Sequence, residues 1–450
     1  MSEIAGPAGF TPLDAREEAL RSLDRRRVEQ ARASHRPVWL FFLLAGPGIL
    51  VMLGENDGPS MLSYATTGAA YGIGFFLPFI VLTFAMAFVV QEMTVRLGIA
   101  TRRGHAELIF ERFGPFWGYF SMLDLAVGNV LTLVTEFIAI RAGAAYFGIP
   151  APVAVGAGVV LVILTVSARR YFTWERAALA LAAFNLLFVP AAMFAHPDAG
   201  AVARAFGTWS PLVGGVTAAF VTLLMANIGA TVTPWMIFFQ QSAVVDKGLT
   251  PADLPQGRFD TALGAVVAAI AAIAAVLAAV PLFTHHVDAS TFAGGADFAT
   301  ALHPYIGNAG ASLFALGMIE AGLVAAMTIS TSSAYAVGEV LRAKHSLNAS
   351  FSSARAFYIS SAASIVIAAA VVLIPHAPLL AITIAVNVIA TLLMAPALLF
   401  LLLLANDREV IGPLANGLKS NLIGGAIVIA IALMGSAYGL ITVFPQVIPK

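Results

Sequence analysis

Long apolar segments alternate with short polar segments along the 450-residue chain, and this alternation predicts a membrane protein. A helix needs about 20 mainly apolar residues to cross a bilayer. Segments of about this length or longer lie at 38–72, 74–96, 116–147, 151–168, 175–195, 211–241, 260–283, 309–341, 356–375, 378–404 and 420–444. The pattern predicts an all-α integral membrane fold with about eleven transmembrane helices. The longest segments are expected to tilt, break or extend into water.

The distribution of Lys and Arg gives these segments an orientation, because cytoplasmic loops of membrane proteins are enriched in both residues. With the N-terminus inside, all but three of the 24 Lys and Arg residues fall in cytoplasmic segments, the exceptions being Arg141, Arg204 and Lys450. Adding or removing one span would scramble this partition. We therefore expect a multi-pass protein of the plasma membrane, with a polar cytoplasmic tail over 1–37 and a transmembrane domain over 38–450. Residues 14–32 of the tail could form a charged surface helix, which we interpret as solvated, with contact to the membrane surface as the alternative.

Two of the segments carry Gly, Pro and polar residues near their centres. The first reads GENDGPS over 54–60, and the sixth reads GATVTP over 229–234. A proline inside a helix removes a backbone hydrogen bond, and non-helical backbone at membrane depth is tolerated only where it is buried in protein or lines a cavity. The two acids of the first segment are costly unless they face water, an ion or a partner. Both helices are therefore predicted to break where the chain is shielded from lipid.

The two predicted breaks lie five spans apart, so the second half of the chain is inverted relative to the first. Broken helices at matching positions of inverted repeats point to a substrate site near the membrane midplane. We predict repeats of five spans over about 38–200 and 211–405, followed by one further helix. A simple kink explains either break alone, but two breaks at equivalent positions, one of them acidic, favour a substrate site.

Composition and motifs exclude several other classes of protein. Charged residues make up 11% of the chain, against about 25% in soluble domains. The net charge of zero gives no basic surface for nucleic acid, and the lack of cysteine excludes disulfides and thiolate metal sites. The chain has no GxxxxGK[ST] or HExxH motif and no visible nucleophile–base pair, so neither an enzyme nor a resident cofactor is expected.

At the two breaks the chain resembles the NRAMP family of divalent metal transporters, and this resemblance extends from about residue 37 to the end. The family's lead sequence is matched by GPGILV over 46–51, and its Asp-Pro-Gly-Asn and Ala-Thr-Val-Met-Pro-His motifs fall on DGPS over 57–60 and ATVTPW over 230–235. The resemblance implies a transporter fold and a metal substrate. It also implies metal ligands at Asp57, Ser60, the backbone carbonyl of Ala230, and Thr233.

This chain departs from the family motifs in a chemically consistent way. Thr233 replaces the methionine of the family, so a soft thioether becomes a hard hydroxyl oxygen. Asn56 and Glu55 could add further oxygen ligands, and an all-oxygen set suits Mg²⁺, Mn²⁺ or Ca²⁺. The pattern looks like that of NRAMP-related magnesium transporters, although the first-span motif differs at 58–60. We therefore expect import of divalent cations, Mg²⁺ first with Mn²⁺ as competitor.

The proton relay that the resemblance implies is largely missing. Family members use histidines of the sixth span and acids of the third span, and the histidine positions here carry Trp235 and Gln240. In the third span Glu136 aligns with the family's glutamate and Leu133 with its aspartate, while Asp124 lies two turns earlier. Weak or absent proton coupling is the prediction.

Several other polar residues lie within predicted spans. Glu136 and Glu320 fit a structural hydrogen bond and a pathway role equally well. Asn387 is a candidate second ligand or water-holder, although a hydrogen bond between helices is the simpler interpretation. Gln240 is a candidate lining residue of the inner vestibule, and Glu55 is a further candidate of the pathway. The adjacent histidines at 285–286 lack the i, i+4 spacing of a zinc site.

The alternative function is a sodium- or proton-coupled carrier of an amino acid or another small organic solute on the same fold. Such carriers bind a substrate carboxylate at the free N–H groups of broken helices. A fixed acid at Asp57 would repel that anion, which favours the divalent cation. The cation and the lipid bilayer are the only partners that the sequence implies, and it predicts no oligomeric state.

Overall fold

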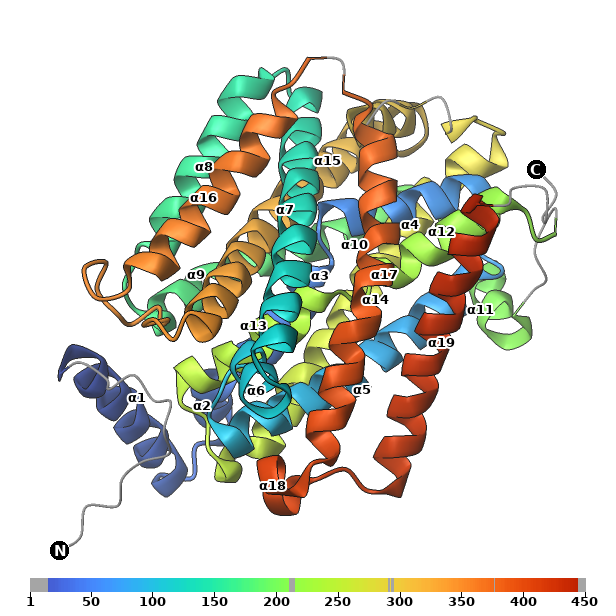
Figure 1. The fold of residues 1–450 in the computed structure, drawn as a ribbon. Coiled ribbons are helices and arrows are strands. Elements are labelled where there is room, and N and C mark those ends of the chain that lie inside the picture. Colours follow the sequence, from blue (N-terminus) through green and yellow to red (C-terminus); the bar gives the residue numbers. More distant parts are fainter. Residues whose placement is uncertain (1–14, 210–214, 290–291, 293–294, 376, 444–450) are drawn as a thin grey trace, which may run out of the picture.

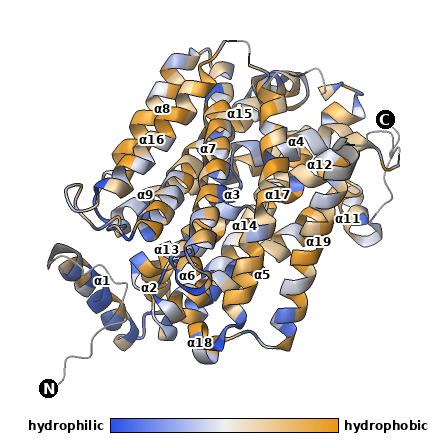
Figure 2. Ribbon diagram, viewed as in Figure 1, coloured by the Kyte–Doolittle hydropathy of each residue, from blue (hydrophilic) through white to orange (hydrophobic). Residues whose placement is uncertain are grey.

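The computed structural model describes residues 15–209, 215–289, 292, 295–375 and 377–443, and all regular elements within these ranges are helices (Figure 1). Hydrophobic residues run along the long helices, whereas hydrophilic residues gather on α1 (Ala15–Ala33) and on nearby loops (Figure 2). This pattern confirms the predicted all-α fold.

The helices follow the order of the predicted spans. The first half contains α2 (Pro37–Leu44), α3 (Pro47–Glu55), α4 (Gly58–Tyr71), α5 (Phe76–Thr101), α6 (His105–Phe113), α7 (Pro115–Tyr146), α8 (Ala151–Val166), α9 (Tyr171–Ala182), the 3-10 turn η1 (Ala183–Leu187) and α10 (Phe188–Phe194). After α11 (Ala199–Thr208), the second half contains α12 (Ala218–Gly229), α13 (Pro234–Lys247), the turn η2 (Pro251–Asp253), α14 (Leu254–Thr284), α15 (Gly295–Val340), α16 (Arg355–Val372) and α17 (Leu379–Asn406). The chain ends with α18 (Arg408–Ile411) and α19 (Leu418–Val443).

Nine helical segments of the described chain are long and apolar enough to cross a membrane, and the bent pair α2–α3 makes a tenth. The remaining predicted span is α8, an apolar helix of 16 residues. The longest helix, α15, is not straight, because Gly307 has non-helical backbone angles there. The prediction of about eleven spans therefore agrees with the structure when the short α8 is included.

The first span is broken twice, whereas the sequence predicted one break. The predicted interruption separates α3 from α4 after Glu55. A second interruption separates α2 from α3, whose axes differ by 58°. The carboxylate of Asp260 on α14 accepts hydrogen bonds from the backbone N–H groups of Gly46 and Gly48 at 3.1 and 2.7 Å. The first backbone N–H groups of a helix have no partner within the helix. At the start of α3, the carboxylate of Asp260 accepts hydrogen bonds from these groups.

Glycines allow the helices to pack closely at the centre. A side chain on Gly143 of α7 would overlap the carbonyl of Ala315 on α15, and one on Gly322 of α15 would press on the carbonyl of Glu136 on α7. Small residues at such contacts let backbones approach where the bilayer gives no hydrophobic drive for helix association. These contacts hold α7 and α15 against each other beside the breaks.

Residues 15–33 form a docked helix rather than a freely solvated tail. Arg25 and Arg32 of α1 pair with Asp253 at 2.8 and 2.6 Å, and Arg21 pairs with Asp246 at 3.4 Å. Asp253 is fully buried. The reason sequence reasoning missed this docking is that the acidic partners lie more than 200 residues away along the chain.

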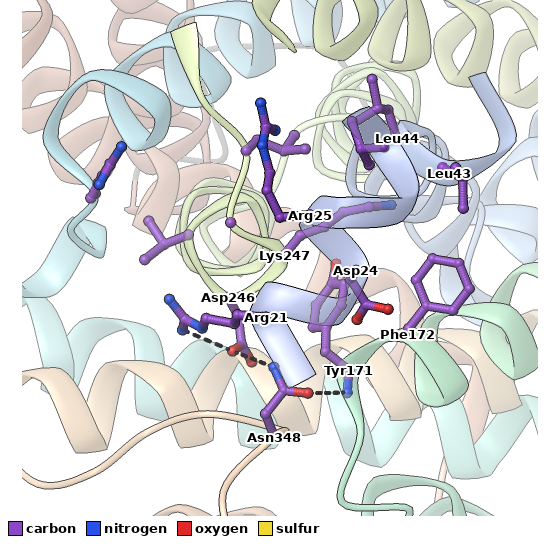
Figure 3. Close-up of a pocket in the computed structure, with 15 residues that line it drawn as sticks. Arg21, Asp24, Arg25, Leu43, Leu44, Tyr171, Phe172, Asp246, Lys247 and Asn348 are labelled. Carbon is purple, nitrogen blue, oxygen red and sulfur yellow. Dashed lines mark hydrogen bonds and ion pairs between the residues drawn. The ribbon is translucent and has the colours of Figure 1, made fainter. Parts of the chain in front are cut away.

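A cavity of about 320 Å³ lies between α1 and the adjoining ends of α2 and α13 (Figure 3). Asn348 spans its base, donating to Asp246 at 3.3 Å and accepting from the backbone N–H of Tyr171 at 3.0 Å. Close by, the buried Lys247 donates to Glu175 at 2.7 Å. Ionic contacts therefore close this face of the molecule, which we call the α1 face.

A larger cavity of about 740 Å³ opens at the other ends of the broken spans. It is lined by the last turns of α4, the first turns of α12, the end of α14 and the start of α17, with His286 among its polar residues. The neighbouring His285 instead stacks on the ring of Tyr305, with centroids 4.6 Å apart. The molecule is therefore more open on the side opposite the α1 face.

Candidate metal site between two broken helices

The first break is built by Asp57 and the residues that follow it. Asp57 caps α4, and its Oδ1 accepts a hydrogen bond from the backbone N–H of Ser60 at 2.9 Å. Pro59 stands in the first turn of α4, where the missing N–H costs no helical hydrogen bond. A side chain on Gly58 would overlap Ala139 of α7, so glycine lets the break lie directly against that helix.

The second break covers residues 230–233, between α12 and α13. Pro234 is the first residue of α13, and Thr233 takes the capping position without capping the helix. Its hydroxyl instead donates to Oε2 of Glu55 at 2.7 Å. The two breaks therefore face each other, and a side chain from the second one contacts an acid of the first.

Three carboxylic acids converge on this junction. Glu55 and Glu136 are fully buried, and Asp57 is 1% exposed. Glu136 reaches the first break from α7, where its Oε2 accepts a hydrogen bond from the backbone N–H of Gly58 at 3.0 Å. Among the described residues, no ion pair joins any of these acids to Lys, Arg or His. Three acids buried this far from solvent need a compensating cation or proton.

Several oxygen atoms at the junction have no hydrogen-bond partner in the described structure. These are Oε1 of Glu55, Oδ1 of Asn56, Oγ of Ser60 and Oε1 of Glu136. Buried polar atoms are normally paired, and unpaired ones often mark an ion or water position. Carboxylate, amide and hydroxyl oxygens are the ligands that hard dications prefer. The junction therefore offers a set of hard oxygen ligands.

Most of the predicted ligands are brought together. Asp57, Ser60, Asn56 and Glu55 lie at the first break, and Thr233 contacts it from the second. The carbonyl oxygen of Ala230 accepts a hydrogen bond from the hydroxyl of Tyr64 at 2.8 Å, so only one of its lone pairs remains for an ion. Tyr64 lies on α4, two turns beyond the break.

The candidate pathway residues are more widely spread. Glu136 belongs to the junction, as described above. Asn387 donates to Ser63 at 3.0 Å, one turn beyond Ser60 on the side of the larger cavity. Gln240 points to α14, where its Nε2 donates to Thr261 at 2.9 Å and its Oε1 has no partner. Asn387 therefore lies between the cavity and the breaks, and Gln240 lies on the side of the α1 face.

Sequence reasoning missed Asn185, which lies in the turn η1 of the fifth span. Its side-chain amide accepts from Nδ2 of Asn56 at 3.0 Å and donates to the backbone carbonyl of Asn56 at 3.1 Å. An amide inside an apolar span was the only available signal, and nothing in the sequence indicates its partner.

The described residues hold no group of three or more His, Cys, Asp or Glu arranged around one metal position. Any ion here must therefore also use hydroxyl, amide or carbonyl oxygens.

Comparison with known proteins decides the family. The model of the Nramp family, natural resistance-associated macrophage protein-like, matches residues 48–442. The chain belongs to the Nramp family. It is 29% identical over 317 residues to the divalent metal cation transporter MntH of Yersinia pestis, which covers 67% of this chain and 73% of that protein. It is 27% identical over 312 residues to MntH of Mycobacterium tuberculosis, with coverages of 66% and 69%.

Solved structures show how widely the fold of this Nramp-family chain is shared. The Eremococcus coleocola manganese transporter superposes with a TM-score of 0.74 at 18% identity, covering 92% of this chain and 90% of that one. MhsT in complex with L-phenylalanine superposes with a TM-score of 0.58 at 13% identity, covering 88% and 97%. Because the same fold occurs with such different ligands, the substrate has to be argued from the site.

Proposed function

We propose that this Nramp-family protein imports divalent metal cations across the plasma membrane by alternating access, with Mg²⁺ as its substrate and Mn²⁺ as a competitor. The observation that carries the proposal is the group of buried acids and unpartnered oxygens between the two breaks. A dication supplies the positive charge that these acids lack in the described structure. The names of the related proteins, which specify divalent metal or manganese, support the same substrate class.

The choice of Mg²⁺ depends on the hardness of the ligands. Thr233 offers a hydroxyl where the family motif has a methionine, and every other unpartnered atom at the first break is an oxygen. Oxygen ligands favour Mg²⁺, Ca²⁺ and Mn²⁺ over softer transition metals. Mg²⁺ keeps several of its waters when bound, so it can be held by the few ligands that the junction offers.

The difference between the two faces supports alternating access. The enrichment of Lys and Arg supports a cytoplasmic position for the α1 face, and the larger cavity would then face outward. An ion would enter there, pass Asn387 and bind between the breaks. Its release would require the α1 face to open, where the Lys247–Glu175 pair now joins α13 to α9.

The driving force is proposed to be the membrane potential, with weak or no proton coupling. Trp235 and Gln240 stand where the family has histidines, and neither side chain exchanges a proton near neutral pH. The potential contributes about 2.3 kcal/mol per charge per 100 mV, and a dication receives twice that. The organic-solute carrier is not proposed, because the acids at the junction would repel a substrate carboxylate.

The test is binding of Mg²⁺, Mn²⁺ and Ca²⁺ to the purified full-length protein by calorimetry, with Asp57→Ala alongside. Removing one member of a buried charge pair costs about 3–5 kcal/mol, so we expect the affinity of the variant for Mg²⁺ to fall more than a hundredfold. Asp124→Asn is the matched control, because Asp124 is an acid of α7 more than three turns from Glu136. Unchanged binding by Asp57→Ala would remove Asp57 from the site.

A further inference from the structure

Glu320 is a buried acid that the site described so far does not use. It lies near the middle of α15 and is 4% exposed. Its Oε2 accepts a hydrogen bond from Nδ2 of Asn185 at 3.4 Å, and its Oε1 has no partner. No Lys, Arg or His forms an ion pair with it in the described part of the chain. An acid in this position is costly and needs a functional or structural reason.

The side chain of Asn185 connects this acid to the first break. Its Nδ2 donates both to Glu320 and to the backbone carbonyl of Asn56, at 3.4 and 3.1 Å. Its Oδ1 accepts from the side chain of Asn56 at 3.0 Å. The carboxylate of Glu320 and the backbone of the broken span are therefore both within hydrogen-bonding distance of one nitrogen atom.

The helix that carries Asn185 is itself interrupted. Residues 183–187 form the 3-10 turn η1 between α9 and α10. A short 3-10 stretch inside a helix often marks a functional hinge. Because Asn185 in this interruption contacts both Asn56 and Glu320, the fifth span connects the first span to α15.

We propose that Glu320 is a positioning residue of the cation site, which, when ionised beside a bound dication, raises the affinity for that dication through Asn185 without touching the ion. The inference rests on the proposed function, because it needs a dication between the breaks. Charges interact over longer distances inside a protein than in water, since the effective dielectric constant is lower. A fourth acid, behind the three at the junction, therefore strengthens binding of a doubly charged ion more than binding of a singly charged one.

The deciding variant is Glu320→Gln, because glutamine keeps an oxygen that can accept from Asn185 but carries no charge. We expect its affinity for Mg²⁺ and Mn²⁺ to fall about tenfold, while its melting temperature without metal stays the same or rises. A purely structural role for Glu320 predicts unchanged affinity, and that result would overturn the inference. A fall in affinity accompanied by a lower metal-free melting temperature would overturn it as well, because damage to the fold would explain both.

Two further variants make the comparison specific. Glu409→Gln removes the same charge from a side chain that is 80% exposed, and its affinity should match that of the unchanged protein. Glu320→Leu removes the hydrogen bond in addition to the charge and should bind more weakly than Glu320→Gln. If the unchanged protein binds no dication, the proposed function fails. If it binds dications through Asp57 and Glu320→Gln binds equally well, only the present inference fails.

Discussion

The hydroxyl of Thr233 is the chemical feature that most distinguishes this junction from the Nramp sequence motif. It is 2% exposed and donates to Glu55 at 2.7 Å, so it already belongs to the acidic group before any ion arrives. A cation placed between Thr233 and Glu55 would take the position of this hydrogen bond. The hydroxyl oxygen of Thr233 and the carboxylate oxygen of Glu55 would then both be ligands of the cation. A thioether at this position would offer a soft sulfur instead.

Thr233→Met should therefore shift selectivity from Mg²⁺ toward Mn²⁺. We expect the ratio of Mn²⁺ to Mg²⁺ affinity to rise about tenfold, because sulfur favours the transition metal. Competition between the two ions for the purified protein measures this ratio. Thr233→Val is the control, since it removes the hydroxyl and adds no sulfur. An equal ratio in both variants would show that Thr233 does not set selectivity.

Individual residues of the site were predictable where the sequence broke an apolar pattern. Asp57, Glu55 and Thr233 interrupt two long apolar segments, so their chemistry was visible without a structure. The partners of Glu320 and Asn56 were not visible, because both contacts run through Asn185, which lies more than 120 residues from either. Such pairs depend on which helices pack together, and the periodicity of one segment carries no information on that.

At the scale of elements, the helix α1 holds several others together by charge. Its arginines reach Asp246 at the end of α13 and Asp253 in η2, and its Asp24 accepts from Arg170 before α9. The buried residues Val28 and Ala31 belong to one apolar cluster with Leu43 and Leu44 of α2. Opening of the α1 face would have to break part of this set.

Replacing Arg25 and Arg32 together by Gln should loosen α1, because both lie within 3 Å of the buried Asp253. The chain has no cysteine, so Leu44→Cys would introduce a single thiol at a position that is 3% exposed beneath α1. We expect this thiol to react with a polar maleimide at least tenfold faster in the double variant.

The control for α1 is the double variant Arg26→Gln with Arg27→Gln. These arginines contact Ser22 and Asp24 within α1 and lie on the same helix. The control removes the same amount of charge from α1 but keeps both ion pairs with Asp253. Its thiol should therefore react at the rate seen with Leu44→Cys alone. Equal acceleration in both double variants would mean that total charge, and not the pairing with Asp253, holds α1 in place.

For the whole molecule, the proposed mechanism predicts metal uptake without acidification. Proteoliposomes loaded with a pH-sensitive dye and given a negative internal potential should take up Mg²⁺ while their internal pH stays constant. Collapsing the potential should slow uptake, because a dication gains about 4.6 kcal/mol per 100 mV, twice the value for a single charge. Acidification in proportion to metal flux would contradict uncoupled transport.

The order and number of spans were predictable, because each needs an apolar length that the bilayer fixes. The second bend of the first span, between α2 and α3, was not predicted. Pro47 begins α3 directly after the bend, and the carboxylate that accepts hydrogen bonds from Gly46 and Gly48 there belongs to Asp260 on α14, more than 200 residues away. The docking of α1 was missed for the same reason. Local pattern thus determined which segments cross the membrane and where the two central breaks lie, whereas the contacts of Asp260 and of α1 depend on long-range packing.

The short helix α8 has a consequence for the surrounding lipid. Its 16 residues extend about 24 Å at 1.5 Å per residue, and its neighbour α16, with 18 residues, extends about 27 Å. The shortest helices that span a bilayer have about 17 residues, so α16 is just long enough and α8 falls just short. Local thinning of the bilayer beside α8 would match its length, and we expect the protein to fit thinner membranes better than thick ones.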